Sequence, residues 1–207
     1  SKELIIMRAF LWCNGELHDE NLTSKFEDIS PLFGVDGGAN KARSVGYNVK
    51  EILGDLDSAN IEELNIDGTL LKDQNYSDLT KTINELSKRG FNEFEVLGVD
   101  GGDTGHILGI WASLAELSTD LIIRLHHQKS TTHRITSHSG SSKINIGESK
   151  LFSVFALTEC DNVTIKDAEW EMINQELKFS TRGLHNRALE EDITITTDGI
   201  LVVIVQN

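Results

Sequence analysis

The chain turns abruptly from apolar to acidic residues where Glu51-Ile52-Leu53 runs into Gly54-Asp55-Leu56-Asp57-Ser58. A short apolar run that ends in glycine and aspartate is typical of a buried parallel strand followed by a loop. Ligands of open parallel sheets bind at the carboxyl ends of the strands. Asp55 and Asp57 are two residues apart, so in an extended geometry both side chains face the same way. The stretch therefore predicts an α/β fold with an acidic ligand site at one edge of its sheet.

The residues on both sides of this stretch repeat the pattern of strand, glycine-containing loop and helix. Leu79, Ile83 and Leu86 recur at helical spacing, and Gly90 ends that helix. Such βαβ repeats indicate a mostly parallel, Rossmann-like sheet in an N-terminal α/β domain, residues 1–128. Further strands are expected at 4–6 with the residues after it, 31–35, 94–98 and 121–125, and helices at 78–89 and 107–117.

The composition and the pattern of the sequence change after about residue 128. Residues 128–142 are rich in Ser, Thr and His and are interpreted as a linker or exposed hairpin. Short β-like runs follow, and Asp198-Gly199 between the last two is a strong hairpin turn. We expect an all-β sandwich over residues 129–207. Its strands are expected at 143–146, 151–155, 162–165, 176–179, 193–196 and 200–204.

Composition excludes several classes of protein. The 207 residues carry a formal net charge of −14, which argues against a nucleic-acid partner because duplex binders need a lysine or arginine stripe. No apolar run approaches the ~18 residues of a membrane span, and Ser1–Met7 lacks the layout of a signal peptide. Cys13 and Cys160 are expected to be thiols. We therefore expect a cytoplasmic protein with no membrane partner.

Loops at the expected carboxyl edge pair acids with glycines or short polar residues. Carboxylates repel a bare polyphosphate but become useful when they hold Mg²⁺, which prefers one or two carboxylates together with waters and phosphate oxygens. Glycines let main-chain amides approach phosphate closely. The pattern predicts a magnesium–phosphate site, formed by Asp36-Gly37-Gly38, Gly54–Ser58, Asp73–Asp78 and Asp100–Asp103.

Each of these loops also has a structural interpretation. Asp78 stands where an acid favours a helix start, so it caps a helix or binds metal. Lys81, one turn later, meets phosphate or pairs with Asp78. His126 and His127 are adjacent and face opposite ways on a strand, so they are interpreted as surface residues. No P-loop and no zinc-type spacing of Cys and His is present, so any nucleotide is held by another arrangement.

Short motifs recur in an order that matches one family. They are Asp36-Gly37-Gly38-Ala39-Asn40, Gly54–Ser58, Asp73–Lys81, Gly101–His106 and, after Trp170, Arg182-Gly183-Leu184-His185-Asn186. The set resembles thiamine pyrophosphokinase, and the likeness covers nearly the whole chain. It implies an α/β nucleotide-binding catalytic domain, a β-sandwich thiamine-binding domain, and a homodimer with active sites between subunits. It also implies an ATP:thiamine diphosphotransferase that forms thiamine diphosphate and AMP, in which the thiamine hydroxyl attacks the β-phosphorus directly.

The resemblance also assigns roles to residues. Mg²⁺ and the diphosphate are implied to lie among Asp55, Asp57, Asp73 and Asp78. Trp170 and Asn186 are implied to lie near thiamine, with Trp170 offering an aromatic face to the cationic thiazolium ring. Nucleotide, phosphate or substrate contacts are implied for Asp36, Asn40, Ser58, Gln74, Lys81, His106 and His185.

Four residues depart from the family pattern. Asn75 replaces an aspartate, Asp103 replaces an arginine, Gly105 replaces an aspartate and His185 replaces a serine. Losing an arginine that donates to phosphate weakens charge stabilisation, and Arg124, Lys129 or Arg134 are candidates to compensate. Two alternatives therefore stay open: a diphosphokinase for another alcohol such as a hydroxymethylpterin, or a catalytically inactive protein that binds thiamine or nucleotide.

Overall fold

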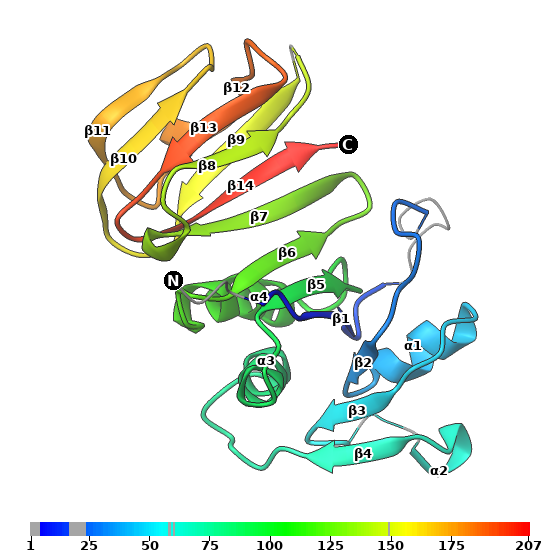
Figure 1. The fold of residues 1–207 in the computed structure, drawn as a ribbon. Coiled ribbons are helices and arrows are strands. Elements are labelled where there is room, and N and C mark those ends of the chain that lie inside the picture. The colour runs from blue at the N-terminus through cyan, green and yellow to red at the C-terminus, as the bar shows by residue number, and fades with distance from the viewer. Residues whose placement is uncertain (1–4, 17–23, 58, 60, 149) are drawn as a thin grey trace. The chain divides into compact units, whose positions relative to one another are not determined.

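The computed structural model describes residues 5–16, 24–57, 59, 61–148 and 150–207 (Figure 1). Its chain forms two compact units. The N-terminal unit comprises Ser1–Leu117 with Leu125–Gln128, and the C-terminal unit comprises Ser118–Arg124 with Lys129–Asn207.

The N-terminal unit is built on strands that pair in parallel. Their order is β5-β1-β2-β3-β4. The chain steps from β1 outward to β4 and then returns to place β5 on the other side of β1, so the order reverses beside β1. In open α/β sheets such a reversal marks the ligand-binding crevice. The bounds are β1 Arg8–Trp12, β2 Leu32–Val35, β3 Glu51–Gly54, β4 Asp67–Leu70 and β5 Glu93–Leu97.

Helices connect these strands. In α3 the side chains of Leu79, Ile83 and Leu86 are buried, as their spacing predicts, and Ser77 caps the helix by accepting from Thr80 N. The expected helices at 78–89 and 107–117 are confirmed to within a few residues. The bounds are α1 Gly38–Ser44, α2 Ile61–Leu64, α3 Asp78–Lys88 and α4 Thr104–Glu116.

One face of the sheet packs against α1. Phe10 and Trp12 of β1 share a buried cluster with Ala39 and Ala42 of α1. A Cβ at Gly38 would lie 1.9 Å from the Trp12 carbonyl oxygen, so only glycine lets the helix approach this closely. The Asp36 loop that leads into α1 is thereby fixed against the end of β1.

The C-terminal unit is an antiparallel sandwich. One group of strands has the order β12-β9-β14-β7 and the other the order β11-β10-β13-β8. Both groups contribute side chains to a single apolar core. The all-β expectation for this part is confirmed. The bounds are β7 Ser130–Thr136, β8 Ser142–Asn145, β9 Leu151–Ala156, β10 Cys160–Lys166, β11 Met172–Leu177, β12 Asn186–Arg187, β13 Asp192–Thr196 and β14 Ile200–Gln206.

Strand β6 is Ile122–His126. Among its described residues the chain has a mixed sheet, few helices, and a second sheet that is wholly antiparallel.

The first expected strand begins later than its apolar run, and the expectation for residues 128–142 is wrong. Ile5 and Ile6 are 83% and 59% exposed, and the strand begins only at Arg8. Residues 128–142 are no linker, because β7 occupies 130–136 and pairs along its whole length with β14 (Ile200–Gln206). The hydroxyl-rich sequence of β7 hides the strand, since Thr132 and Thr136 are buried in place of apolar residues.

Candidate functional site

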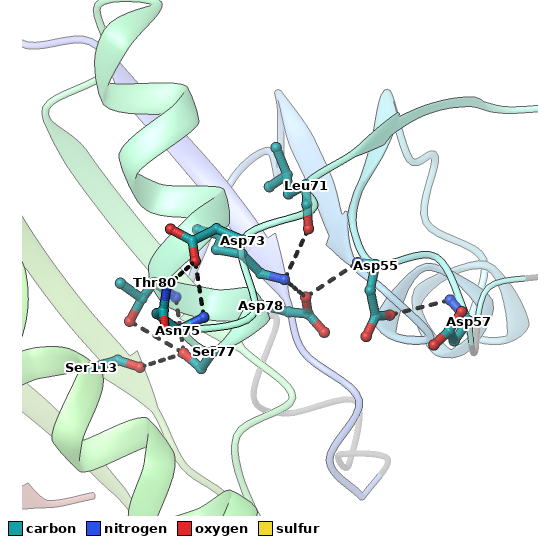
Figure 2. A network of polar contacts seen from close by, with 10 residues as sticks. Asp55, Asp57, Leu71, Asp73, Asn75, Ser77, Asp78, Thr80 and Ser113 are labelled. Atoms are coloured by element: carbon teal, nitrogen blue, oxygen red, sulfur yellow. Dashed lines mark hydrogen bonds and ion pairs between the residues drawn. The ribbon is translucent and has the colours of Figure 1, made fainter.

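Three aspartates converge at the carboxyl edge of the parallel strands. Asp36 follows β2, Asp55 follows β3 and Asp78 begins α3. One carboxylate oxygen from each lies within 4.8 Å of the other two. We call this group the carboxylate cluster. Asp36 is buried and the other two are half-buried, and Figure 2 shows Asp55 and Asp78 side by side.

Main-chain geometry brings the cluster together. The Asp36 N–H donates to the Leu53 carbonyl at 2.8 Å, and the Asp55 N–H donates to Asp78 Oδ1 at 3.2 Å. Gly54 has φ +144°, and a Cβ there would lie 3.2 Å from Asp36 Cβ and 3.3 Å from Asp78 Cγ. Glycine at 54 is therefore what lets the three carboxylates meet.

Lys81 balances part of this charge. Its Nζ lies 2.9 Å from Asp78 Oδ1 and donates to the Leu71 carbonyl at 3.0 Å. The side chain is buried, so the pair with Asp78 is little screened by solvent. Of the two interpretations of Lys81, the structure has the ion pair with Asp78. Because Ser77 is the helix cap, Asp78 is not needed for that purpose.

The carboxylate cluster fits a divalent cation. Magnesium binds oxygen ligands at about 2.1 Å, so opposite ligands lie about 4.2 Å apart. The separations in the cluster are compatible with that geometry. Its donors are hard carboxylate oxygens, which Mg²⁺, Ca²⁺ and Mn²⁺ prefer.

Asp57 and Asp73 lie outside this cluster. Leu56 has φ +65°, so the chain is not extended between Asp55 and Asp57, and the geometry assumed from the sequence does not hold. Asp57 instead donates its N–H to Asp55 Oδ1 at 3.2 Å. Asp73 Oδ1 accepts from Asn75 N at 2.9 Å and from Asn75 Nδ2 at 3.0 Å (Figure 2). In the described part of the chain, Asp36 takes the third place in the cluster.

The other expected contacts of the N-terminal unit are spread along the same edge. Gln74 is exposed in the loop before α3, and Asn40 is half-buried in α1. His106 is exposed in the first turn of α4. Ser58 lies outside the described residues.

Two of the departures from the family pattern have a structural role in α4. Asp103 caps the helix, since its Oδ1 accepts from Gly105 N at 2.8 Å and from His106 N at 3.3 Å. A carboxylate at this position stabilises a helix start. It offers no donor to phosphate.

Arg134, a candidate to replace the missing arginine, is committed elsewhere. Its guanidinium donates to the carbonyls of Ser118 at 3.0 Å and Leu121 at 3.2 Å. Burial lowers the pKa of Arg134 to about 10. These contacts all lie within the C-terminal unit.

Trp170 and Asn186 form a pair in the C-terminal unit. Trp170 N donates to Asn186 Oδ1 at 3.1 Å, and Asn186 Nδ2 donates to the Trp170 carbonyl at 2.7 Å. Asn186 is buried, whereas Trp170 is 59% exposed. Asn186 therefore holds the main chain in a position that presents the indole to solvent. His185 lies beside it, exposed, with φ +55° and its N–H bonded to Ser153 Oγ at 3.0 Å.

The interpretation of both histidines at 126 and 127 as surface residues is wrong. His126 is 4% exposed, and its Nε2 lies 2.5 Å from Glu95 Oε2. His127 Nδ1 lies 2.7 Å from Asp100 Oδ1, and its ring stacks on Trp111 with the centroids 5.7 Å apart. The position of both histidines at the end of an apolar strand is the signal that could have found them.

Comparisons with known families match both units of the chain. The family described as thiamin pyrophosphokinase, catalytic domain, matches residues 23–125. The family described as thiamin pyrophosphokinase, vitamin B1 binding domain, matches residues 132–202. The comparison with curated proteins gave no match.

Solved structures share the fold at low sequence identity. Thiamine pyrophosphokinase from Bacillus subtilis is 19% identical with a TM-score of 0.80, over 97% of this chain and 99% of that one. Thiamin pyrophosphokinase from Candida albicans is 15% identical with a TM-score of 0.73, over 96% and 89%. The yeast enzyme is 14% identical with a TM-score of 0.75, over 96% and 86%. No helix among the described residues has both the length and the apolar character of a membrane span.

Proposed function

Because this chain belongs to the thiamin pyrophosphokinase family, we propose that its carboxylate cluster is the centre of diphosphate transfer from ATP to thiamine. Membership makes the chain a transferase and kinase that forms thiamine diphosphate. In the reaction, the thiamine hydroxyl oxygen bonds to the β-phosphorus while the bond from that phosphorus to the α–β bridging oxygen breaks. AMP leaves with the bridging oxygen, and the hydroxyl proton passes to solvent.

The proposal depends chiefly on the convergence of Asp36, Asp55 and Asp78. We assign Mg²⁺ to these three residues. When bound, the ion neutralises phosphate charge and orients the diphosphate. The protein supplies the positioning on which phosphoryl transfer depends. Gly54 allows the carboxylates to approach, and Lys81 fixes the orientation of Asp78.

The remaining residues of this edge are proposed to bind the rest of the nucleotide and the diphosphate. Asp57 and Asp73 sit beside the cluster in loops that their own hydrogen bonds stabilise, where a second ion or metal-bound waters would meet them. Contacts to nucleotide or phosphate are proposed for Asn40, Ser58, Gln74 and His106. This part of the chain, 1–128, is proposed to be a Rossmann-like nucleotide-binding and catalytic domain, which the parallel pairing and the reversal beside β1 support.

Residues 129–207 are proposed to bind thiamine. The exposed indole of Trp170 offers an aromatic face to a thiazolium cation, and Asn186 and His185 lie next to it in the chain. We propose a homodimer in which one subunit supplies the carboxylate cluster and its partner supplies Trp170. We further propose a cytoplasmic location, which the free thiols of Cys13 and Cys160 support.

Product identification tests the substrate. ATP, Mg²⁺ and the purified chain are incubated with thiamine or with a hydroxymethylpterin, and the products are separated and identified by mass. We expect thiamine diphosphate and AMP in equal amounts, with no pterin diphosphate. The match of residues 132–202 to a vitamin B1 binding domain is the reason for that preference. A diphosphorylated pterin without thiamine diphosphate would overturn the proposal.

A further inference from the structure

Lys41 carries its ammonium group from α1 to the main chain that follows β1. Its Nζ donates to the Asn14 carbonyl at 3.2 Å and to the Gly15 carbonyl. The reach is possible because α1 is packed closely on this strand: a Cβ at Gly38 would lie 2.8 Å from the Cys13 carbonyl carbon. The ammonium group therefore stands at the carboxyl end of β1.

The carboxyl end of β1 lies between the loop after β5 and the carboxylate cluster. On one side, the Gly15 N–H donates to the Gly98 carbonyl at 2.8 Å and the Glu16 N–H to the Asp100 carbonyl at 2.7 Å, which ties it to the loop after β5. On the other side, α1 follows directly on Asp36 of the carboxylate cluster, and a Cβ at Gly38 would lie 1.9 Å from the Trp12 carbonyl oxygen, so the Asp36 loop lies against the end of β1. Because β1 lies between β2 and β5 in the strand order, a polyphosphate that extended from the cluster toward β5 would cross the end of β1.

Lys41 differs from Lys81 in how its charge is used. Lys81 is paired with a carboxylate, which cancels much of its attraction for a phosphate. Among the described residues, Lys41 bonds to two main-chain carbonyls and to no carboxylate. Carbonyls orient an ammonium group without neutralising it, and an ammonium group has three N–H donors. One donor and the full positive charge are left for an anion.

We propose that Lys41 binds the phosphate chain of ATP, donating its third N–H to a phosphate oxygen and offsetting negative charge at the centre of the sheet edge. The inference rests on the proposed function and adds a cation to it. It also supplies a cation in place of the arginine that the family pattern has at position 103, since Asp103 caps α4 and offers no donor to phosphate. The phosphate-binding cation of this chain then comes from α1 and not from the loop after β5.

The test compares Lys41→Met and Lys41→Arg with the wild type in the full-length chain, and uses Arg43→Met as a control on the same helix. Arg43 bonds to Asn48 in the last turn of α1. AMP formation is measured against ATP at saturating thiamine and against thiamine at saturating ATP. Losing a charge-assisted hydrogen bond weakens binding about tenfold to a hundredfold. We expect Lys41→Met to raise the KM for ATP by that factor and to leave the KM for thiamine within twofold of the wild type. Lys41→Arg should recover much of the loss, and Arg43→Met should match the wild type.

Calorimetric titration with a non-hydrolysable ATP analogue and Mg²⁺ separates this inference from the proposed function. If the wild type forms no AMP from thiamine but binds the analogue, the proposed function fails, and weaker binding by Lys41→Met still supports the Lys41 contact. Equal binding of the analogue by wild type and Lys41→Met would overturn the proposed contact between Lys41 and phosphate. Equal loss toward both substrates, with a lowered melting temperature and no recovery in Lys41→Arg, would show that Lys41 only ties α1 to β1.

Discussion

At the scale of single residues, hydrogen bonds with Asp57 and Asp78 fix Asp55 in the carboxylate cluster. Its N–H bonds to Asp78 and its carboxylate accepts from Asp57 N. Asp55→Asn keeps the shape of the side chain and removes its charge. We expect turnover to fall at least about a hundredfold, which is typical for loss of one charge-stabilising group, with little change in melting temperature. Steady-state AMP formation and a thermal melt measure both. Asp67→Asn, in exposed β4 (Asp67–Leu70), is the matched control, and a fully active Asp55→Asn would remove Asp55 from the metal site.

Gly54 tests the geometry of the carboxylate cluster. Gly54→Ala adds a Cβ 3.2 Å from Asp36 Cβ, at a position where the backbone φ is +144°. We expect a cost of about 1–2 kcal/mol in stability from the backbone strain and the contact, and a smaller rise in melting temperature on adding Mg²⁺ because the carboxylates are forced apart. Gly46→Ala is the control, since Gly46 has φ +92° and no heavy atom within 4 Å of a Cβ. If both variants keep the full Mg²⁺ effect, the cluster does not depend on Gly54.

The loops that form the site were predicted from the sequence, but which of their carboxylates come together was not. Asp55 and Asp78 belong to the cluster, whereas the family resemblance implied Asp57 and Asp73 as the other metal residues and gave Asp36 a nucleotide or phosphate contact. The sequence also placed Asp55 and Asp57 on the same side, on the assumption that side chains alternate along an extended chain. The left-handed φ of Leu56 breaks that alternation. A non-glycine residue in this region is rare, so local sequence preference gives no signal for it.

At the scale of elements, a salt bridge ties the start of β3 to the end of α3. Arg89 NH1 lies 2.7 Å from Glu51 Oε2, and Thr69 of β4 donates to Glu51 Oε1 at 2.5 Å. Burial alone would raise the pKa of Glu51, but the hydrogen bonds from Arg89 and Thr69 outweigh it, so this pKa lies below its ordinary value.

A lowered carboxyl pKa gives stability that is present above the unfolded value of about 4.3 and is lost as the pH falls through the folded value. We therefore expect Glu51→Gln to lose about 1 kcal/mol of stability at neutral pH. The difference from wild type should shrink to nothing in more acid solution, well below pH about 4. Urea unfolding at a series of pH values measures it. A difference that stays constant with pH would mean that the charge of Glu51 is not the cause.

The cap of α4 gives a second test at this scale. Asp103→Ala removes the acceptor of two main-chain N–H groups, and we expect a loss of about 1 kcal/mol in the free energy of unfolding. Asp103→Asn keeps an oxygen acceptor and should lose much less. Equal losses in both variants would show that charge, not capping, is what Asp103 contributes.

Elements were predicted well where their periodicity was apolar and missed where it was not. Helix α3 follows from Leu79, Ile83 and Leu86. Helix α1 was missed because Gly38-Ala39-Asn40 gives no apolar stripe, and its packing depends on the close approach at Gly38. Strand β7 was missed because its buried positions include Thr132, Arg134 and Thr136. Arg134 and Thr136 are buried because carbonyls after α4 accept their hydrogen bonds, and such long-range contacts leave no local pattern.

At the scale of the whole molecule, the proposed homodimer predicts both mass and complementation. Light scattering during size exclusion should give about twice the chain mass of 23.0 kDa. Asp55→Asn and Trp170→Ala, each nearly inactive alone, should recover up to about a quarter of wild-type activity when unfolded and refolded together, because half of the dimers then carry one intact site. A monomeric active enzyme, or no recovery on mixing, would contradict a site shared between subunits.

The reaction itself, diphosphate transfer from ATP to thiamine, is the central claim about the whole molecule. The most direct measurement is AMP formation by the wild-type chain from ATP, with thiamine and Mg²⁺ each present or withheld. The carboxylate cluster and the family of the chain predict AMP only when both are present, at a rate that Asp55→Asn reduces at least about a hundredfold. AMP formation that ignores thiamine, or none at all from thiamine and Mg²⁺ together, would contradict it.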